Sequence, residues 1–216
     1  MEESTQREKV LKRVRNSLIS KTNNPFPNPD FDSNIYPNIS DSLEIKFAEE
    51  FINASGNFIF CESEQELTEN LNALNLENHW HSFYCKEEKI KNILTQAHLP
   101  YLSEEVDFPE IEVGITLCEY LVARTGSIMV SSKQLCGRKM FVFPPIHIVI
   151  AYTSQLVPDI KNALLALRKK YEDKIPSLVS FITGPSRTAD IEKTLVMGMH
   201  GPKEVYLFLI DNTVYE

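Results

Sequence analysis

A polar turn near the C-terminal end of the chain has the residue types that bind anions. It reads Gly184-Pro185-Ser186-Arg187-Thr188 and follows an apolar run. Backbone N–H groups and hydroxyls of such a turn are hydrogen-bond donors, and a guanidinium pairs with a carboxylate or phosphate through two parallel bonds. Ligands of α/β sheets bind beyond the carboxyl ends of strands. We therefore expect an anion site where this turn leaves its strand.

Acidic residues and a histidine close to this turn are candidates for proton transfer. Asp190 and Glu192 follow it, and either carboxylate could orient Arg187, accept hydrogen bonds from substrate hydroxyls or act as a general base. His200 lies in the next turn, GMHGP, where Gly201 and its neighbours fix the backbone. A structural alternative stays open, in which Asp190 caps a helix and Arg187 forms a surface ion pair.

Two upstream segments are weaker candidates. Thr125, Gly126 and Ser127 form a small hydroxyl-rich turn between apolar runs, preceded by Arg124 as a second cation. This turn either helps to bind an anion or is a plain hairpin turn. His147 stands between isoleucines in a β-rich run, a pattern typical of a half-buried, hydrogen-bonded histidine.

Length, charge and cysteine spacing limit the class of protein. The 216 residues are enough for one well-buried domain, and the net charge of −8 argues against nucleic acid or an anionic membrane as the main partner. No apolar run approaches the roughly 18 residues of a membrane span, and the N-terminus lacks a signal-peptide core, so we expect a cytoplasmic protein. The four cysteines are widely spaced, which predicts packed thiols and gives no sign of an iron–sulfur cluster or a metal site. Neither a nicotinamide- or flavin-binding G-x-G-x-x-G nor a Walker A motif occurs.

The first 41 residues are predicted to lie outside the main domain. Thr5 and Glu8 form a capping box, and an apolar stripe follows it, which predicts an N-terminal helix ending near Ser20. Residues 21–41 are rich in Pro and Asn and predict an extended arm that lies on its own domain or on a neighbour's. A homo-oligomer that exchanges arms is one of the arrangements this leaves open.

Residues 42–216 are predicted to form an α/β domain. Helical and strand patterns alternate up to about residue 98, with a capping box at Ser63 and Glu66, which favours a parallel sheet with helices on its faces. A β-rich stretch then suggests antiparallel or mixed pairing, before a last helix that begins near Pro158. The strands expected in this stretch span 111–116, 119–123, 127–131, 139–143 and 146–152.

The candidate segments together resemble one protein family. Residues 183–192 (TGPSRTADIE) and 198–202 (GMHGP), with 125–127 (TGS) and 143–147 (FPPIH) upstream, are similar to the motifs of the LUD domain in the lactate utilisation protein C (YkgG-like) family. The resemblance covers about Glu112 to Ile210, and it adds His147 to the expected ligand-binding residues. Arg124 departs from the pattern, which usually has a non-basic residue there.

The resemblance implies a fold and a role. The implied fold is a three-layer α/β/α domain like the NagB/RpiA/CoA-transferase group, with a mixed sheet. The implied role is that of a non-redox accessory subunit in oxidising L-lactate to pyruvate, beside iron–sulfur partner proteins, with a small anionic ligand or cofactor bound. Two alternatives stay open: an enzyme acting on a sugar phosphate or a CoA ester, and a domain that senses a metabolite. The sequence leaves open whether the domain is catalytic.

Overall fold

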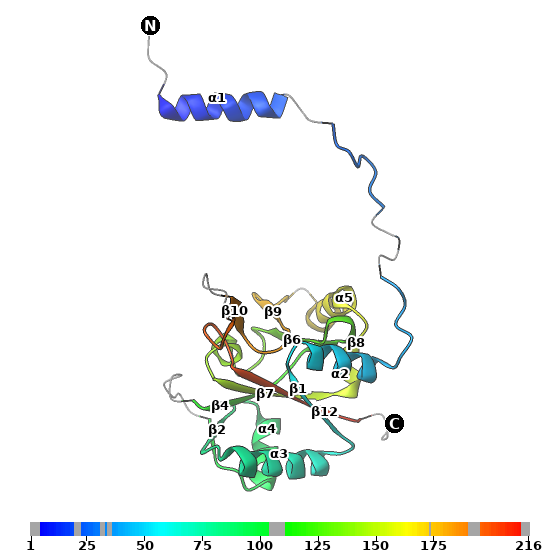
Figure 1. Cartoon of the computed structure of the whole chain (residues 1–216), viewed down its shortest axis with the longest axis vertical. Coiled ribbons are helices and arrows are strands. Elements are labelled where there is room, and N and C mark those ends of the chain that lie inside the picture. The colour runs from blue at the N-terminus through cyan, green and yellow to red at the C-terminus, as the bar shows by residue number, and fades with distance from the viewer. Residues whose placement is uncertain are drawn as a thin grey trace. The chain divides into compact units, whose positions relative to one another are not determined.

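The computed structural model describes most of the chain (Figure 1). The described residues are 5–19, 23–30, 33, 36–103, 111–172, 174–189 and 195–212. The chain divides into two compact units, Met1–Asn38 and Ile39–Glu216. All candidate site residues belong to the second unit.

The first unit contains helix α1 (Gln6–Ile19). The predicted capping box is confirmed, because Thr5 N donates to Glu8 Oε2 at 2.8 Å and Glu8 N donates to Thr5 Oγ1 at 3.3 Å. Across the described residues, no helix is both long enough and apolar enough to cross a membrane.

A six-stranded parallel sheet forms the centre of the second unit (Figure 1). Its hydrogen-bond register aligns Val113 with Ile146, and Ile146 with Glu204. The parallel sheet predicted from the strand–helix alternation is therefore confirmed. In spatial order the strands are β1 (Asn57–Cys61), β12 (Glu204–Ile210), β7 (Ile146–Tyr152), β4 (Val113–Leu117), β2 (Phe83–Tyr84) and β3 (Tyr101–Leu102).

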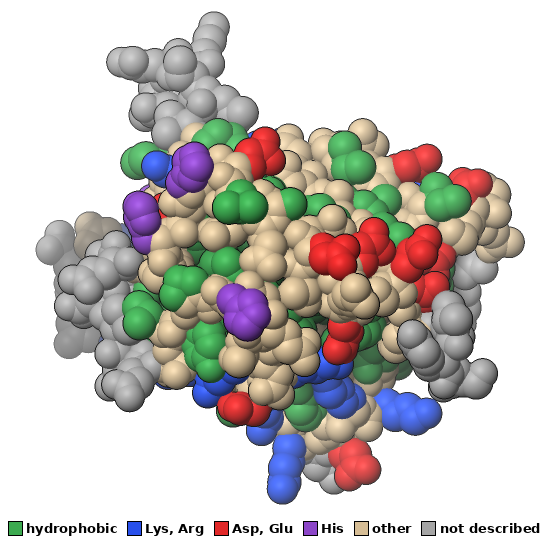
Figure 2. Space-filling view, turned by 90° about the horizontal axis from the view of Figure 1, so that it is seen from below, with side chains coloured by type: hydrophobic (Ala, Val, Ile, Leu, Met, Phe, Trp, Pro, Cys, Tyr) green, Lys and Arg blue, Asp and Glu red, His purple; other side chains and the backbone are tan. Residues whose placement is uncertain are grey.

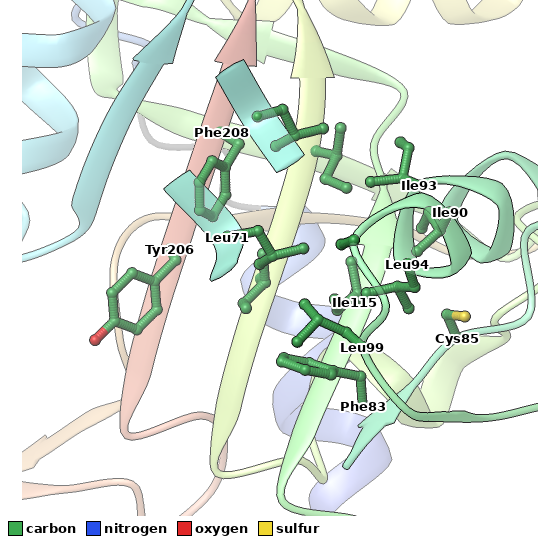
Figure 3. Close-up of a cluster of buried hydrophobic side chains, with 14 of the residues drawn as sticks. Leu71, Phe83, Cys85, Ile90, Ile93, Leu94, Leu99, Ile115, Tyr206 and Phe208 are labelled. Atoms are coloured by element: carbon green, nitrogen blue, oxygen red, sulfur yellow. The ribbon is translucent and has the colours of Figure 1, made fainter. Parts of the chain in front are cut away.

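Helices α3 (Glu64–Asn78) and α4 (Glu88–Gln96) cover one face of this sheet. Ser63 caps α3 by accepting a hydrogen bond from Glu66 N, as its sequence position predicts. Their apolar sides pack on strand residues such as Phe208 and Ile115 (Figure 3). Figure 2 shows the protein from the α3 side, where acidic and basic side chains gather in separate parts of the surface.

A second, smaller sheet and helix α2 (Leu43–Asn53) cover the other face. The smaller sheet has mixed pairing, as predicted: β5 and β9 are antiparallel to β6, and β8 is parallel to β5. Helix α5 (Ile160–Tyr171) packs on the small sheet through Ala163 and Leu167. In spatial order the strands of the smaller sheet are β8 (Leu156–Val157), β5 (Tyr120–Val122), β6 (Ser127–Ser131) and β9 (Val179–Ile182).

These layers confirm the predicted α/β class, with mixed pairing confined to the smaller sheet. The narrower likeness to the NagB/RpiA/CoA-transferase group stays a prediction. A short hairpin, β10 (Arg187–Ala189) and β11 (Leu195–Met197), precedes β12.

The strand predicted at 139–143 is wrong. Arg138–Phe141 form a 3₁₀ helix instead. Met140 and Phe141 are consecutive, yet both belong to the same buried cluster, whereas consecutive residues of a strand point to opposite faces. A strand could not place both side chains in that one cluster.

Candidate functional site

The Thr125–Ser127 turn is pressed against the end of helix α2. Ala123–Thr125 form a short 3₁₀ helix that ends at Gly126, which has φ of 56°. A Cβ at Gly126 would overlap the backbone of Phe51. Only glycine combines this left-handed conformation with so close an approach.

Three hydroxyls meet beside this turn. Ser127 Oγ lies 2.8 Å from Thr125 Oγ1 and 2.8 Å from Thr183 Oγ1. Ser127 is buried, whereas Thr183 is exposed. Thr183 is the first residue of the 183–192 motif but was not among the predicted ligand-binding residues. The contact joins the start of β6 to the end of β9.

The Gly184–Thr188 turn is also held against the end of α2. Gly184 has φ of 72°, and a Cβ there would overlap the carbonyl oxygen of Ala54. Arg187 Nη2 donates a 3.0 Å hydrogen bond to the same oxygen. Because a helix C-terminus carries partial negative charge, this is a favourable position for a guanidinium. Arg187 is otherwise exposed and keeps further N–H donors.

The two C-terminal motifs are joined directly to each other. Ser186 N donates to Pro202 O at 2.8 Å, and Gly198 N donates to Ser186 O at 2.9 Å. A Cβ at Gly201 would lie 3.1 Å from Ser186 Cβ, so the backbones are closely apposed. We call residues 124–127, 183–188 and 198–202 together the joined turns.

The joined turns lie beside the amino ends of the central strands. Lys203 N donates to Pro145 O at 2.7 Å, which ties residues just before β12 to residues just before β7. Ala54 likewise precedes β1. The Gly184–Thr188 turn follows the carboxyl end of β9, as predicted for the strand that it leaves, but β9 belongs to the antiparallel part of the smaller sheet and not to the central sheet.

His147 is buried within the core. Its Nε2 lies 2.8 Å from Thr116 Oγ1, and its Nδ1 has no hydrogen-bond partner in the described part of the chain. Burial lowers the pKa of the imidazole to about 4. The ring packs 6.3 Å from that of Phe141, and no hydrogen bond links it to the described joined turns. His147 is thus hydrogen-bonded as predicted, but fully rather than half buried.

The remaining candidates are dispersed or not described. Thr188 lies in β10 opposite Val196. His200 is exposed, and no hydrogen bond joins its side chain to any described residue. Asp190 and Glu192 lie outside the described residues, so their predicted roles stay predictions.

A polar cluster that the sequence analysis missed lies at the carboxyl ends of the central strands. Tyr152 Oη donates to Glu64 Oε1 at 2.9 Å, and Lys89 Nζ lies 3.5 Å from the same oxygen. Burial, together with the hydrogen bond to Glu64, raises the pKa of the Tyr152 hydroxyl. Nearby, Thr153 Oγ1 donates to Asn212 Oδ1 at 2.9 Å. The available signal was a polar residue directly after two apolar strands, Thr153 after β7 and Asp211 after β12.

An open cavity of about 410 Å³ adjoins this carboxyl edge. Apolar side chains of α2 and β1 form most of its wall, with polar residues at its end. Its volume lies in the range of small-molecule pockets. The lining residues are Ser42, Glu44, Ile45, Ala48, Phe58, Phe60, Thr153 and Asp211.

No group of three or more His, Cys, Asp or Glu side chains that could hold a metal ion is found within the described ranges. Two histidines lie close together in the His79-Trp80-His81 segment, on either side of a buried tryptophan. His79 adopts a left-handed conformation at the end of α3, and His81 N donates to Glu112 Oε2, while Trp80 is buried between Phe83 and Tyr206.

Comparisons with known proteins agree with this architecture. The model of the LUD domain family matches residues 105–210. The chain is 35% identical over 105 residues to lactate utilization protein C of Bacillus licheniformis, covering 47% of this chain and 44% of that protein. It is 37% identical over 112 residues to the same-named protein of a Geobacillus species, covering 50% and 46%. These matches span less than half of the relatives' own length.

A solved structure extends the likeness of fold beyond the matched segment. A DUF162 family protein from Deinococcus radiodurans superposes with a TM-score of 0.59 at 15% identity, covering 78% of this chain and 96% of that one. Its identity is low enough that it speaks to the fold alone. The match to the LUD domain family covers residues 105–210, which contain all the predicted motifs, and it confirms the family resemblance predicted for this part of the chain.

Proposed function

We propose that the chain is an accessory, non-redox subunit of an L-lactate utilisation system and binds a small anionic ligand at the joined turns. Relatives that share 35–37% identity over the matched half carry the name lactate utilization protein C, which supports the metabolic context. Electron transfer is assigned to iron–sulfur partner proteins, as the family resemblance implies.

The contact between the joined turns is the observation that carries the ligand site. Ser186 bonds to Pro202, and Arg187 is held by the Ala54 carbonyl at the neighbouring helix end. This arrangement pre-positions the guanidinium, so a ligand does not have to order it. The hydroxyls of Thr125 and Thr183 each lie 2.8 Å from Ser127 Oγ, and the adjacent Gly126 and Gly184 lie against the same end of α2.

The chemistry of these groups fits a carboxylate. A guanidinium with unused N–H groups forms charge-assisted hydrogen bonds to carboxylate oxygens, which contribute about 1.5–3 kcal/mol each. Hydroxyls donate to the same oxygens or accept from a ligand hydroxyl. A small 2-hydroxy acid or 2-oxo acid presents both kinds of group.

Growth of the native host on L-lactate tests the proposed role. Deleting the gene should prevent growth on L-lactate and leave growth on glucose unchanged. The wild-type gene should restore growth, and iron–sulfur proteins should co-purify with the tagged chain. Normal growth of the deletion strain on L-lactate, with no iron–sulfur protein recovered, would contradict the proposal.

A further inference from the structure

Strand β1 forms an edge of the central sheet. It pairs with β12 on one side, and no described strand pairs with its other side. An edge strand presents unpaired backbone N–H and C=O groups, which protein chains usually protect with charges, proline or a bulge. The sequence of β1, NFIFC, contains none of these. It is an apolar, uncharged edge with high strand propensity.

The three central residues of β1, Phe58-Ile59-Phe60, are symmetric about Ile59. Phe58 and Phe60 flank Ile59 and point to the face that α2 covers, because side chains alternate along a strand. If two copies of β1 pair antiparallel about a two-fold axis at Ile59, Phe58 of one copy faces Phe60 of the other. Aromatic cross-strand pairs of this kind stabilise a sheet.

The surface beside this edge carries exposed apolar side chains on the α2 side, next to the carboxylates of Glu44 and Asp211 in the cavity wall. Ile45 and Ile52 of α2 are each 56% exposed, and Phe60 is 43% exposed. The cavity between α2 and β1, lined by Ile45, Phe58 and Phe60, opens next to the same edge. With about 150–250 Å² for a full aromatic side chain, the exposed part of Phe60 alone offers on the order of 100 Å² of surface per copy, and Ile45 and Ile52 add to it. A stable interface needs about 800 Å² per partner, so these side chains and the paired backbone together form a substantial part of one.

Pairing with a second copy of the chain through one two-fold rotation brings the free strand edges and the apolar side chains of both copies together. A two-fold axis perpendicular to the sheet keeps α2 of both copies on the same face and brings the two apolar surfaces together. Such an interface is self-complementary, which is the commonest arrangement in soluble oligomers. The strand contains no charge that its own copy would repel.

We infer that the protein forms a two-fold dimer in which β1 of one copy pairs antiparallel with β1 of the other, centred on Ile59. The central sheets of the two copies then form one continuous sheet. Phe58 and Phe60 of both copies, with Ile45, form the apolar seam on the α2 face. The joined turns do not contribute to this seam, so the dimer does not depend on the proposed ligand site.

The mass of the full chain in solution tests the inference. Light scattering after gel filtration at tens of micromolar should give twice the 24.8 kDa chain mass. Phe60→Lys places a charge in the seam at a position that is already 43% exposed, so the fold should tolerate it while the mass falls to that of one chain. The matched control is Leu135→Lys, at a side chain 72% exposed in a loop outside β1 and α2, and it should keep the dimer mass.

Hydrogen–deuterium exchange makes the location of the interface visible. Amides of residues 57–61 should exchange more slowly in the wild-type protein than in Phe60→Lys, with equal circular dichroism spectra showing that both are folded. A wild-type chain of 24.8 kDa mass would overturn the inference. So would a dimer that Phe60→Lys leaves intact, because another surface would then hold the copies together.

Discussion

Arg187 donates a hydrogen bond of 3.0 Å to the carbonyl oxygen of Ala54, 133 residues earlier in the chain. This contact fixes the most characteristic family motif to the C-terminal end of helix α2. The same carbonyl oxygen leaves no room for a side chain at Gly184. One backbone oxygen therefore contacts the turn at both Gly184 and Arg187. The turn is therefore a rigid part of the fold as well as a candidate binding site.

Removing the Arg187 guanidinium should destabilise the protein modestly. Arg187→Ala loses the hydrogen bond to the Ala54 carbonyl. Because this hydrogen bond is exposed to solvent, we expect the free energy of unfolding to fall by only about 1 kcal/mol. Urea denaturation measures this directly. Arg168→Ala removes an exposed arginine from α5 and should change stability by less than about 0.5 kcal/mol. Equal effects of the two changes would show that the Ala54 contact contributes nothing.

The Gly126 position should not tolerate a methyl group. Gly126→Ala combines a positive φ with overlap against the Phe51 backbone, and we expect a loss of roughly 3 kcal/mol or more. Gly137 offers a control without a close contact, since it also has a positive φ but no atom within 4 Å of its added Cβ. Its ψ of 172° differs from the 37° of Gly126 and lies in a region restricted to glycine, so Gly137→Ala should cost about 1–3 kcal/mol from backbone strain alone. A similar loss for both variants would contradict the close approach of the turn to α2.

Stability should depend on pH through His147. Burial lowers its pKa in the folded protein to about 4, whereas the unfolded chain titrates near 6.5, so the unfolded state binds more protons between these values. Stability is therefore fully present above pH 6.5 and falls as pH decreases toward 4, by about 2 kcal/mol between pH 7 and pH 5 from this residue. Urea denaturation at both pH values measures the difference.

A variant without the imidazole isolates this contribution. His147→Asn cannot titrate, so its stability should change less between pH 7 and pH 5 than that of the wild type, although its stability at pH 7 is lower. The same pH dependence in the variant would assign the effect to other groups.

The buried Glu119 should be essential for the packing of α5. Its side chain is 1% exposed; Oε2 accepts from Lys170 Nζ at 2.7 Å, and Oε1 accepts from Ser131 and Tyr171. Glu119→Gln replaces one carboxylate oxygen with an amide NH₂ group, which cannot accept from these donors. We expect the free energy of unfolding to fall by about 3 kcal/mol. Glu49→Gln, at a side chain 57% exposed, should change stability by less than about 0.5 kcal/mol. Thermal unfolding compares the two, and a small change at Glu119 would argue against its burial as a charged group.

Local patterns predicted much of the fold. The capping box at Thr5 and the parallel sheet follow from short-range residue types and spacing, and they are confirmed. At Ser63 only the N-cap half of the predicted box forms, because Glu66 Oε2 accepts from Glu62 N instead of Ser63 N. The 139–143 segment failed because its apolar residues suit a strand, while two consecutive side chains pack into one cluster. Periodicity cannot distinguish these two ways of burying a short run.

The site was harder to predict than the fold, since its contacts join distant parts of the chain. The motifs contain Arg187, Ser127 and Thr183, but not Ala54, and they do not show that Thr183 lies beside Ser127. The position of the turns at the amino ends of the central strands depends on strand order, which no local pattern encodes. Tyr152 and Glu64 are 88 residues apart, and only the order of the strands brings them together.

Ligand binding by the joined turns is the central claim, and calorimetric titration of the full chain tests it most directly. L-lactate, pyruvate and inorganic phosphate are the probes, with Arg187→Lys as the variant and Arg168→Lys as its matched control. At least one carboxylate should bind the wild type and the control equally. Binding to Arg187→Lys should be at least tenfold weaker, because lysine keeps the charge and loses the planar fork. Absence of binding by all three anions, or equal affinity of Arg187→Lys and the wild type, would contradict ligand binding by the joined turns.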